Sequence, residues 1–166
     1  MARDHARTYV SIWGTDFTDL SGEAQRLYWV LTSQHNLTYC GVLDYIPNRL
    51  ANLAGDTDAE DIQRALNELE ASRHVVVDYD TSEILVRTFV RWDGLLDSPN
   101  VTKAMLKARA LIMSDHLREA LDREISKAFE ADPKRAGWKG FKAADGTLYA
   151  RLCGRGSAKG SGRGSA

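Results

Sequence analysis

The chain has 166 residues, of which 43% are hydrophobic, and a mean hydropathy of −0.37. This composition excludes a disordered protein, and no apolar run approaches the roughly 20 residues that span a bilayer, so no membrane role is expected. The two cysteines are too few for a disulfide framework, and the first residues lack the apolar core of a signal peptide. We therefore expect a globular, cytoplasmic protein.

The charge is divided unevenly along the chain, although the formal net charge is only −1. Residues 131–166 carry eight Lys or Arg against two Asp, a net charge of +6. Residues 1–130 carry 14 basic and 21 acidic side chains, a net charge of −7. An acidic body with a basic end predicts that the basic end meets a polyanion, or that the two ends meet each other.

Two elements are predicted at the start of the chain. Residues 7–13 alternate imperfectly and favour a strand, whereas residues 21–34 carry apolar side chains at helical spacing. Ser21 fits the N-cap of this helix because its hydroxyl can accept a hydrogen bond from a free amide of the first turn. We expect the helix to pack across the two helices that follow.

A short strand or turn at residues 42–46 precedes the first of these two helices. Residues 47–54 suit a two-turn helix, since Pro47 pre-sets the backbone angle of a first helical position. Gly55 fits the residue that ends a helix in the left-handed region. The turn between the two helices is therefore predicted to be tight.

The second helix is predicted to run to about residue 73. Thr57 and Glu60 stand at the spacing of a capping box, in which a hydroxyl and a carboxylate bond the free amides of the first turn. Apolar residues then recur at helical spacing and predict one buried face. They are Ala59, Ile62, Leu66 and Leu69.

Two β-branched runs, residues 75–80 and 84–90, flank a polar turn and predict a hairpin. Helix, tight turn, helix and hairpin in this order are typical of a winged helix-turn-helix. The predicted fold class is therefore α+β, with residues 1–93 as the winged-helix domain.

Residues 94–130 are predicted to form a C-terminal helical extension. Asn100 can cap a long helix, whose two apolar stripes do not continue in one register, so we expect a bend near Ser114. The stripes can cover the winged domain, or they can form a homodimer interface through residues 100–130. Both interpretations stay open at this point.

Residues 131–166 are predicted to form a basic, largely flexible tail. Trp138 and Phe141 resemble an aromatic anchor in an otherwise loose segment. From Gly154 onward the sequence contains only Gly, Arg, Ser, Ala and Lys, a composition that cannot bury a core.

A winged helix usually places its second motif helix in the major groove of DNA. Gln63, Arg64 and Asn67 lie off the apolar face of that helix, and their side chains can make paired hydrogen bonds to base edges. Five carboxylates on the same helix oppose this role, because each one near a phosphate costs attraction. They are Asp58, Glu60, Asp61, Glu68 and Glu70.

Further polar and basic side chains of the region are candidates for contacts with the DNA backbone. Arg87 and Arg91 would share one face of the second hairpin strand and track a backbone, or they would pair with the many acids of the body. The candidates are Asn48, Arg49, Asn52, Arg73, Arg87 and Arg91.

Several short motifs together resemble a known family. They are Ser21-Gly-Glu-Ala-Gln25, Tyr39-Cys-Gly-Val42, Arg49-Leu-Ala51, Ala65-Leu-Asn-Glu-Leu69 and Phe89-Val-Arg-Trp-Asp-Gly94. In this order they look like the small winged-helix DNA-binding or replication-initiation proteins of actinobacteria and their phages, over about residues 5–130. The chain is more distantly similar to the N-terminal domains of phage replisome organisers. The resemblance implies binding to double-stranded DNA during phage replication or transcription control.

Other classes of function have less support in the sequence. The sequence contains no Walker loop, nucleophile elbow or metal-ligand run, so no enzyme, metal or cofactor is predicted. The alternative is a protein-interaction module, in which the acidic second helix docks on a basic host replication or transcription protein. A negative surface on residues 58–70 favours that alternative, whereas a positive strip shared with Arg49, Arg87 and Arg91 favours DNA.

Overall fold

The N-terminal segment is helical where a strand was predicted. The computed structural model describes residues 6, 10–14 and 16–154. Val10–Gly14 (η1) and Asp16–Asp19 (η2) are 3-10 helices, so the predicted strand is wrong from residue 10, and residues 7–9 lie outside the described part. The ring of Trp13 stands edge-on to that of Phe17, with centroids 5.8 Å apart. This N-terminal segment therefore contacts the rest of the chain through aromatic packing and not through pairing with a strand.

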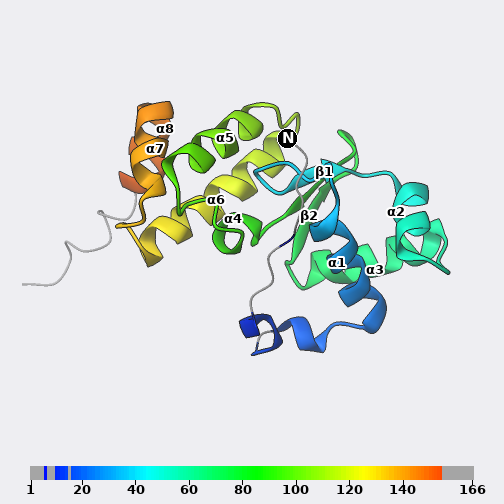
Figure 1. Ribbon diagram of the computed structural model, residues 1–166. Coiled ribbons are helices and arrows are strands. Elements are labelled where there is room, and N and C mark those ends of the chain that lie inside the picture. Colours follow the sequence, from blue (N-terminus) through cyan, green and yellow to red (C-terminus); the bar gives the residue numbers. More distant parts are fainter. Residues whose placement is uncertain (1–5, 7–9, 15, 155–166) are drawn as a thin grey trace, which may run out of the picture.

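Three helices and a three-stranded antiparallel sheet form one half of the molecule, opposite α7 and α8 (Figure 1). The strand order is β1-β3-β2, with Leu85 of β3 opposite Val42 on one side and Val76 on the other. The α+β class is therefore confirmed. The elements are α1 (Gly22–Ser33), β1 (Val42–Asp44), α2 (Pro47–Ala54), α3 (Ala59–Ala71), β2 (Val75–Asp78) and β3 (Glu83–Val86).

Two of the predicted helix ends are confirmed, and a third is shifted by one residue. The Ser21 hydroxyl accepts a hydrogen bond from Ala24 N at 3.2 Å, and Gly55 ends α2 with a φ of +66°. The capping box of α3 is formed by Asp58 and Asp61 instead of Thr57 and Glu60. The Thr57 hydroxyl instead donates to the carbonyl oxygen of Ala51 at 3.2 Å, which ties the turn back to α2.

The second hairpin strand is shorter than predicted. It ends at Val86, and Phe89–Trp92 forms a short helix, α4, so residues 89 and 90 are not part of the sheet. Phe89 packs so closely on Gly41 that a Cβ there would lie 2.8 Å from the Phe89 Cβ. Gly41 also has a φ of +82°, which a side chain disfavours. Phe89 therefore packs on the turn before β1, although the β-branched run predicted that it would continue the strand.

Four further helices complete the described chain. The break near Ser114 is confirmed, since its hydroxyl caps α6 by accepting a hydrogen bond from Leu117 N at 3.0 Å. The prediction of a largely flexible tail from residue 131 is wrong for residues 137–153, which are helical and partly buried. The helices are α5 (Pro99–Ala110), α6 (Asp115–Ala131), α7 (Gly137–Ala144) and α8 (Gly146–Cys153).

Glycine allows α7 to lie directly on the start of α5. A Cβ on Gly140 would stand 2.6 Å from Pro99 Cα, and one on Gly137 would stand 2.7 Å from the carbonyl carbon of Leu96. Trp138 and Phe141 are consequently buried, with the Trp138 ring edge-on to Phe129 of α6 at 5.1 Å. The predicted aromatic anchor therefore belongs to the core.

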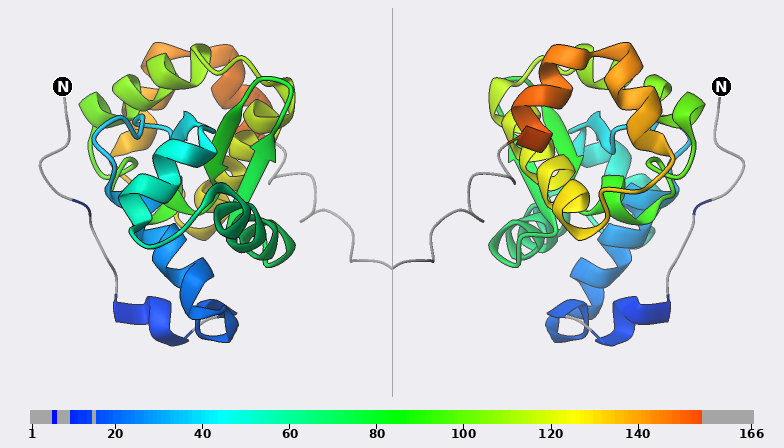
Figure 2. Two further views of the ribbon diagram at one scale, coloured as in Figure 1. Left: turned by 90° about the vertical axis from the view of Figure 1, so that its right-hand side faces the viewer. Right: turned by 90° about the vertical axis from the view of Figure 1, so that its left-hand side faces the viewer.

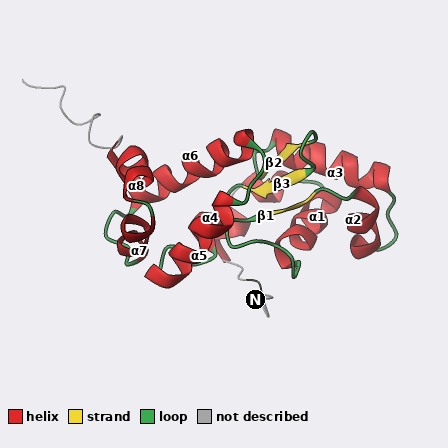
Figure 3. Cartoon of the chain, turned by 90° about the horizontal axis from the view of Figure 1, so that it is seen from above, coloured by secondary structure: helices red, strands yellow, loops and turns green. Residues whose placement is uncertain are grey.

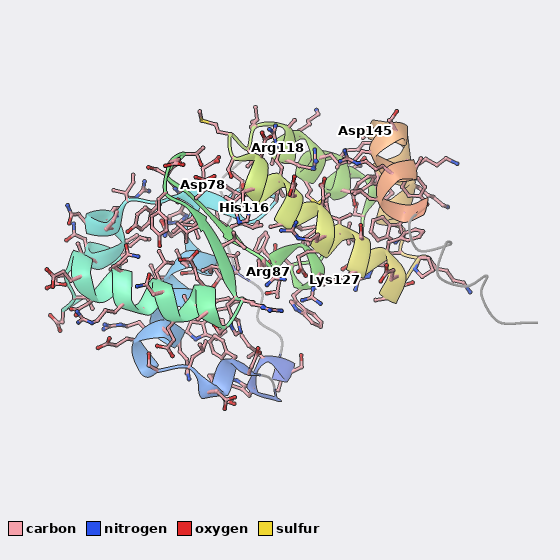
Figure 4. The ribbon with its side chains drawn as sticks, turned by 180° about the vertical axis from the view of Figure 1, so that it is seen from behind. Asp78, Arg87, His116, Arg118, Lys127 and Asp145 are labelled. Carbon is pink, nitrogen blue, oxygen red and sulfur yellow. The ribbon has the colours of Figure 1, made fainter. Side chains whose placement is uncertain are left out.

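The start of α6 is bound to the hairpin by two carboxylates. Glu83 accepts hydrogen bonds from the amides of Met113 (3.1 Å) and Ser114 (2.8 Å), and the Ser114 hydroxyl donates to Asp78. That hydrogen bond, foremost among the causes, lowers the pKa of Asp78. Figure 4 shows Asp78 on the hairpin beside His116 at the start of α6. The tip of the hairpin is thus used for internal contacts.

The sheet lies between the group of α1 to α3 and helix α6 (Figures 1 and 3). Both apolar stripes of residues 100–130 are buried: Met105 and Ile112 on one, and Leu117, Leu121 and Ile125 on the other. Helix α6 packs on β2 and β3, as the covering interpretation expects, whereas α5 packs against α7. These side chains are not available to a second copy of the chain.

The molecule is elongated, with different elements at its two ends. Figure 2 shows α2 and α3 toward the viewer on the left, and α7 and α8 toward the viewer on the right. None of the helices in the described part is both long and apolar enough to cross a membrane.

Candidate nucleic-acid interface

Helix α3 presents a strip of exposed side chains on the face opposite its core contacts. Its buried residues are Ile62, Ala65, Leu66 and Leu69. Five other residues of α3 are half-buried, and the remaining four, three or four positions apart, are exposed. We call these the outward strip: Glu60, Arg64, Asn67 and Ala71. Two of the three predicted base readers therefore stand on it.

Helix α2 packs against α3 and adds three more of the predicted residues. Asn48, Arg49 and Asn52 are exposed, while Leu50 and Ala51 between them are buried. The structure thus brings five predicted DNA-binding residues to neighbouring helices at one end of the molecule.

Two of the five carboxylates on α3 are used at its first turn. Asp58 Oδ1 accepts hydrogen bonds from the amides of Glu60 and Asp61, both at 2.9 Å. Asp61 in turn accepts one from Asp58 N at 3.2 Å and pairs with Arg64. Both acids therefore stabilise the helix start, where a negative charge also complements the helix dipole.

The carboxylates near the end of α3 are likewise bound within the chain. Glu68 accepts hydrogen bonds from the amide (2.6 Å) and the hydroxyl (2.7 Å) of Ser21. These two bonds, that from the hydroxyl first, lower the pKa of Glu68. Glu70 accepts from Val77 N at 3.2 Å and from the Tyr79 hydroxyl at 3.0 Å. Only Glu60 of the five lies on the outward strip.

Gln63, the third predicted base reader, is half-buried and is hydrogen-bonded within the chain. Its amide contacts Asn67 at 2.8 Å, Tyr79 at 3.0 Å and the hydroxyl of Tyr45. The two tyrosine rings stand edge to face with centroids 5.4 Å apart. Sequence reasoning missed both, although the pairs Asp44-Tyr45 and Asp78-Tyr79 follow similar apolar runs at the ends of β1 and β2.

Arg87 and Arg91 hold a buried carboxylate and do not share a strand face. Arg87 follows β3, Arg91 lies on α4, and both pair with Glu124 of α6, at 2.7 and 3.1 Å. Lys127 adds a third contact at 2.9 Å, and Figure 4 shows Arg87 and Lys127 close together at this junction. Glu124 is only 1% exposed. The alternative that these arginines pair with acids of the body is therefore the correct one.

The charges around Glu124 outweigh the effect of its burial. Burial alone raises the pKa of this carboxyl, but the hydrogen bonds from Lys127 and Arg87 and the charge of Arg91 bring the pKa below its ordinary value. Glu124 therefore carries its charge at neutral pH and keeps both arginines in place.

Arg73 is exposed and has a φ of +63°, and its carbonyl oxygen accepts a hydrogen bond from Arg87 at 3.1 Å. It lies just beyond the C-terminal end of α3, apart from the residues of α2. The hairpin between residues 75 and 86 carries no Lys or Arg. A contact of this hairpin with phosphates is therefore not supported.

Comparison with protein-family models, with curated proteins and with solved structures finds no match to this chain. In the part of the chain that the structure describes, no three His, Cys, Asp or Glu side chains are placed to hold a metal ion. The geometry of α2 and α3 is therefore the basis for a functional proposal.

Proposed function

We propose that the chain is a winged helix that binds double-stranded DNA through α2 and α3. The order α1-β1-α2-α3-β2-β3, with β1 paired to β3, is the order of a winged helix and supports this interpretation. The resemblance of its sequence motifs to actinobacterial and phage proteins suggests a role in replication initiation or transcription control.

One observation carries the proposal. Arg64 and Asn67 stand on the outward strip. Of the five carboxylates of residues 58–70, all except Glu60 accept hydrogen bonds from other groups of the chain. These carboxylates therefore have structural roles within the chain, while they keep their negative charge. The side chains best suited to base edges remain on the side of the helix that a groove would meet.

In this arrangement α3 lies in the major groove. Arg64 leaves Asp61 to form paired hydrogen bonds with a guanine edge, and Asn67 contacts a neighbouring base. Asn48, Arg49 and Asn52 on α2 hold the backbone and fix the register of α3.

The test begins with selection of preferred duplexes from a random pool, followed by fluorescence anisotropy on the selected sequence. Arg64→Ala and Asn67→Ala should each weaken specific binding by about 10- to 100-fold, since one good base contact is worth about 1–3 kcal/mol. Arg123→Ala is the matched control, because Arg64 and Arg123 have side chains 63% and 58% exposed and each pairs with an acid one turn away. Equal binding by all three variants and the parent chain refutes the assignment.

A protein partner is the second candidate. Residues 58–70 carry five carboxylates and one arginine, and the two arginines expected to offset them are bound to Glu124. If the full chain retains no duplex even at low salt, a basic protein surface becomes the better ligand for α3. Cross-linking from residue 64 then identifies whether α3 is the contact.

A further inference from the structure

A network of hydrogen bonds joins α3 to the residues that follow β1 and β2. Glu70 Oε2 accepts from the Tyr79 hydroxyl at 3.0 Å, and the Tyr79 oxygen contacts Gln63 Nε2 at 3.0 Å. The same nitrogen contacts Asn67 Oδ1 at 2.8 Å, and Gln63 Oε1 lies against the hydroxyl of Tyr45. These five side chains are linked in one continuous arrangement.

The carboxylate of Glu70 fixes the direction of every bond in this network. An ionised carboxylate only accepts hydrogen bonds, so the single proton of Tyr79 points to Glu70. The Tyr79 oxygen must then accept from its other neighbour, which places the NH₂ group of Gln63 toward it. Burial is the main cause that raises the pKa of Tyr79 above its ordinary value of 10, and the Glu70 carboxylate acts in the same direction. The Tyr79 hydroxyl therefore keeps its proton and remains a hydrogen-bond donor at neutral pH.

The orientation of Asn67 follows from that of Gln63. The NH₂ group of Gln63 also faces Asn67, which must accept through Oδ1. Its Nδ2 therefore points away from the network and makes no further hydrogen bond among the described residues. Asn67 lies on the outward strip, so this NH₂ group is presented to the surroundings.

We propose that the network holds Asn67 as a hydrogen-bond donor and that its ligand is the acceptor edge of guanine, N7 with O6, in duplex DNA. The ligand assignment rests on the proposed function, whereas the orientation of Asn67 does not. A free asparagine reads adenine by donating to N7 and accepting from the 6-amino group. Here the accepting oxygen is bound to Gln63, so the donor group is left to select the base. Gln63, Tyr79 and Glu70 are positioning residues.

The orientation is measured first, by the solvent-exchange rates of side-chain NH₂ protons in NMR spectra of the full chain without DNA. The Gln63 protons should exchange about 2- to 10-fold more slowly than those of Asn67, the effect of a hydrogen bond worth about 0.5–1.5 kcal/mol. Glu70→Gln, whose amide can donate as well as accept, should reduce that difference. Tyr79→Phe removes the connecting hydroxyl and should do the same.

The matched control is Glu68→Gln. It makes the same chemical change on the same helix, at a carboxylate that bonds only Ser21 and does not touch the network. It should leave the exchange rates of Gln63 and Asn67 unchanged. Equal rates for the two amides in the parent chain, or equal effects of Glu70→Gln and Glu68→Gln, overturn the proposed orientation.

The ligand is tested by repeating the duplex selection with each variant. The base pair read by residue 67 is the one at which Asn67→Ala loses its preference, and the parent chain should select guanine there. Glu70→Gln should admit adenine about as often as guanine, while Glu68→Gln should not. A preference for adenine or cytosine in the parent chain overturns the ligand assignment. Slow exchange at Gln63 without selection of any duplex supports the orientation and refutes the proposed function.

Discussion

The substitution Glu124→Gln tests whether the contact between the hairpin and α6 depends on charge. The Glu124 side chain is 1% exposed and pairs with Arg87, Arg91 and Lys127, at 2.7, 3.1 and 2.9 Å. Glutamine has nearly the same shape and still accepts a hydrogen bond, so that no cavity forms. The change therefore removes the negative charge and leaves the three cations around a neutral group.

The expected loss of stability follows from the exposure of these cations. Removing one partner of a fully buried pair costs about 3–5 kcal/mol. The side chains of Arg87 and Arg91 are 20% and 33% exposed, so water compensates for part of the loss. We expect the free energy of unfolding to fall by about 2–3 kcal/mol, and the midpoint of thermal unfolding to fall by about 5–10 °C.

Urea unfolding measures the effect, with Glu119→Gln as the matched control on the same helix. Glu119 is 72% exposed and lies 3.7 Å from Arg123, so its loss should cost less than about 0.5 kcal/mol. A change of that size for Glu124→Gln as well would refute the reasoning. It would mean that the arginines gain as much from water as from the carboxylate.

The pH dependence gives an independent check on the same group. The pKa of Glu124 in the folded chain lies below its ordinary value of 4.5, because the three cations outweigh the effect of burial. A depressed pKa contributes stability that is complete above the ordinary value and is lost as the pH falls through the folded value. The difference between the parent chain and Glu124→Gln should therefore shrink below about pH 4.5. A difference that grows in acid would contradict the direction of the shift.

Two further predictions concern the helix contact and the proposed DNA surface. Gly140→Ala should destabilise the fold by about 1–3 kcal/mol, because its Cβ would stand 2.6 Å from Pro99 Cα, while Gly146→Ala, with nothing within 4 Å, should be tolerated in the same urea titration. Arg49→Ala should lower the slope of log affinity against log salt by about 0.9 in anisotropy titrations, as expected when one phosphate contact is lost. An unchanged slope would exclude Arg49 from the backbone contacts.

Local sequence patterns predicted helices whose ends are set by neighbouring residues. They misplaced the ends of elements that depend on contacts between residues far apart in the sequence. Ser21, Pro47 and Gly55 act within one turn of their own helix, and each has the predicted role. The end of β3 depends instead on the fit of Phe89 against Gly41, which are far apart in sequence. A run of β-branched residues contains no information about that contact.

The error in the tail has a related cause. Helices α7 and α8 have eight residues each, too short for a clear period, and the sequence predicted a loose segment around Trp138 and Phe141. Gly137 and Gly140 directly precede these aromatic residues in the sequence. In the structure these glycines permit close contact with α5. Glycine marks flexibility or close approach, and only the three-dimensional arrangement distinguishes them.

The sequence predicted which residues of α3 lie off its apolar face, but not which other parts of the chain they contact. Arg64 and Asn67 were placed correctly off the apolar face, since helical spacing alone fixes that. The roles of Glu68 and Glu70 depend on Ser21 and Val77, whose positions beside α3 are set by tertiary packing. The sequence therefore shows how many carboxylates α3 carries, but not which groups of the chain they bind.

The burial of Glu124 also determines how the molecule responds to ionic strength. Dissolved ions screen exposed charges over about 10 Å at 0.1 M salt, but they screen enclosed pairs much less. Arg49 and Arg64 lie in solvent, whereas the pair of Glu124 with Arg87 lies inside the protein. Concentrated salt should therefore weaken the proposed attraction of α2 and α3 for DNA, while the hairpin stays attached to α6. If the proposed function holds, a high-salt wash should remove bound DNA from the protein without unfolding it.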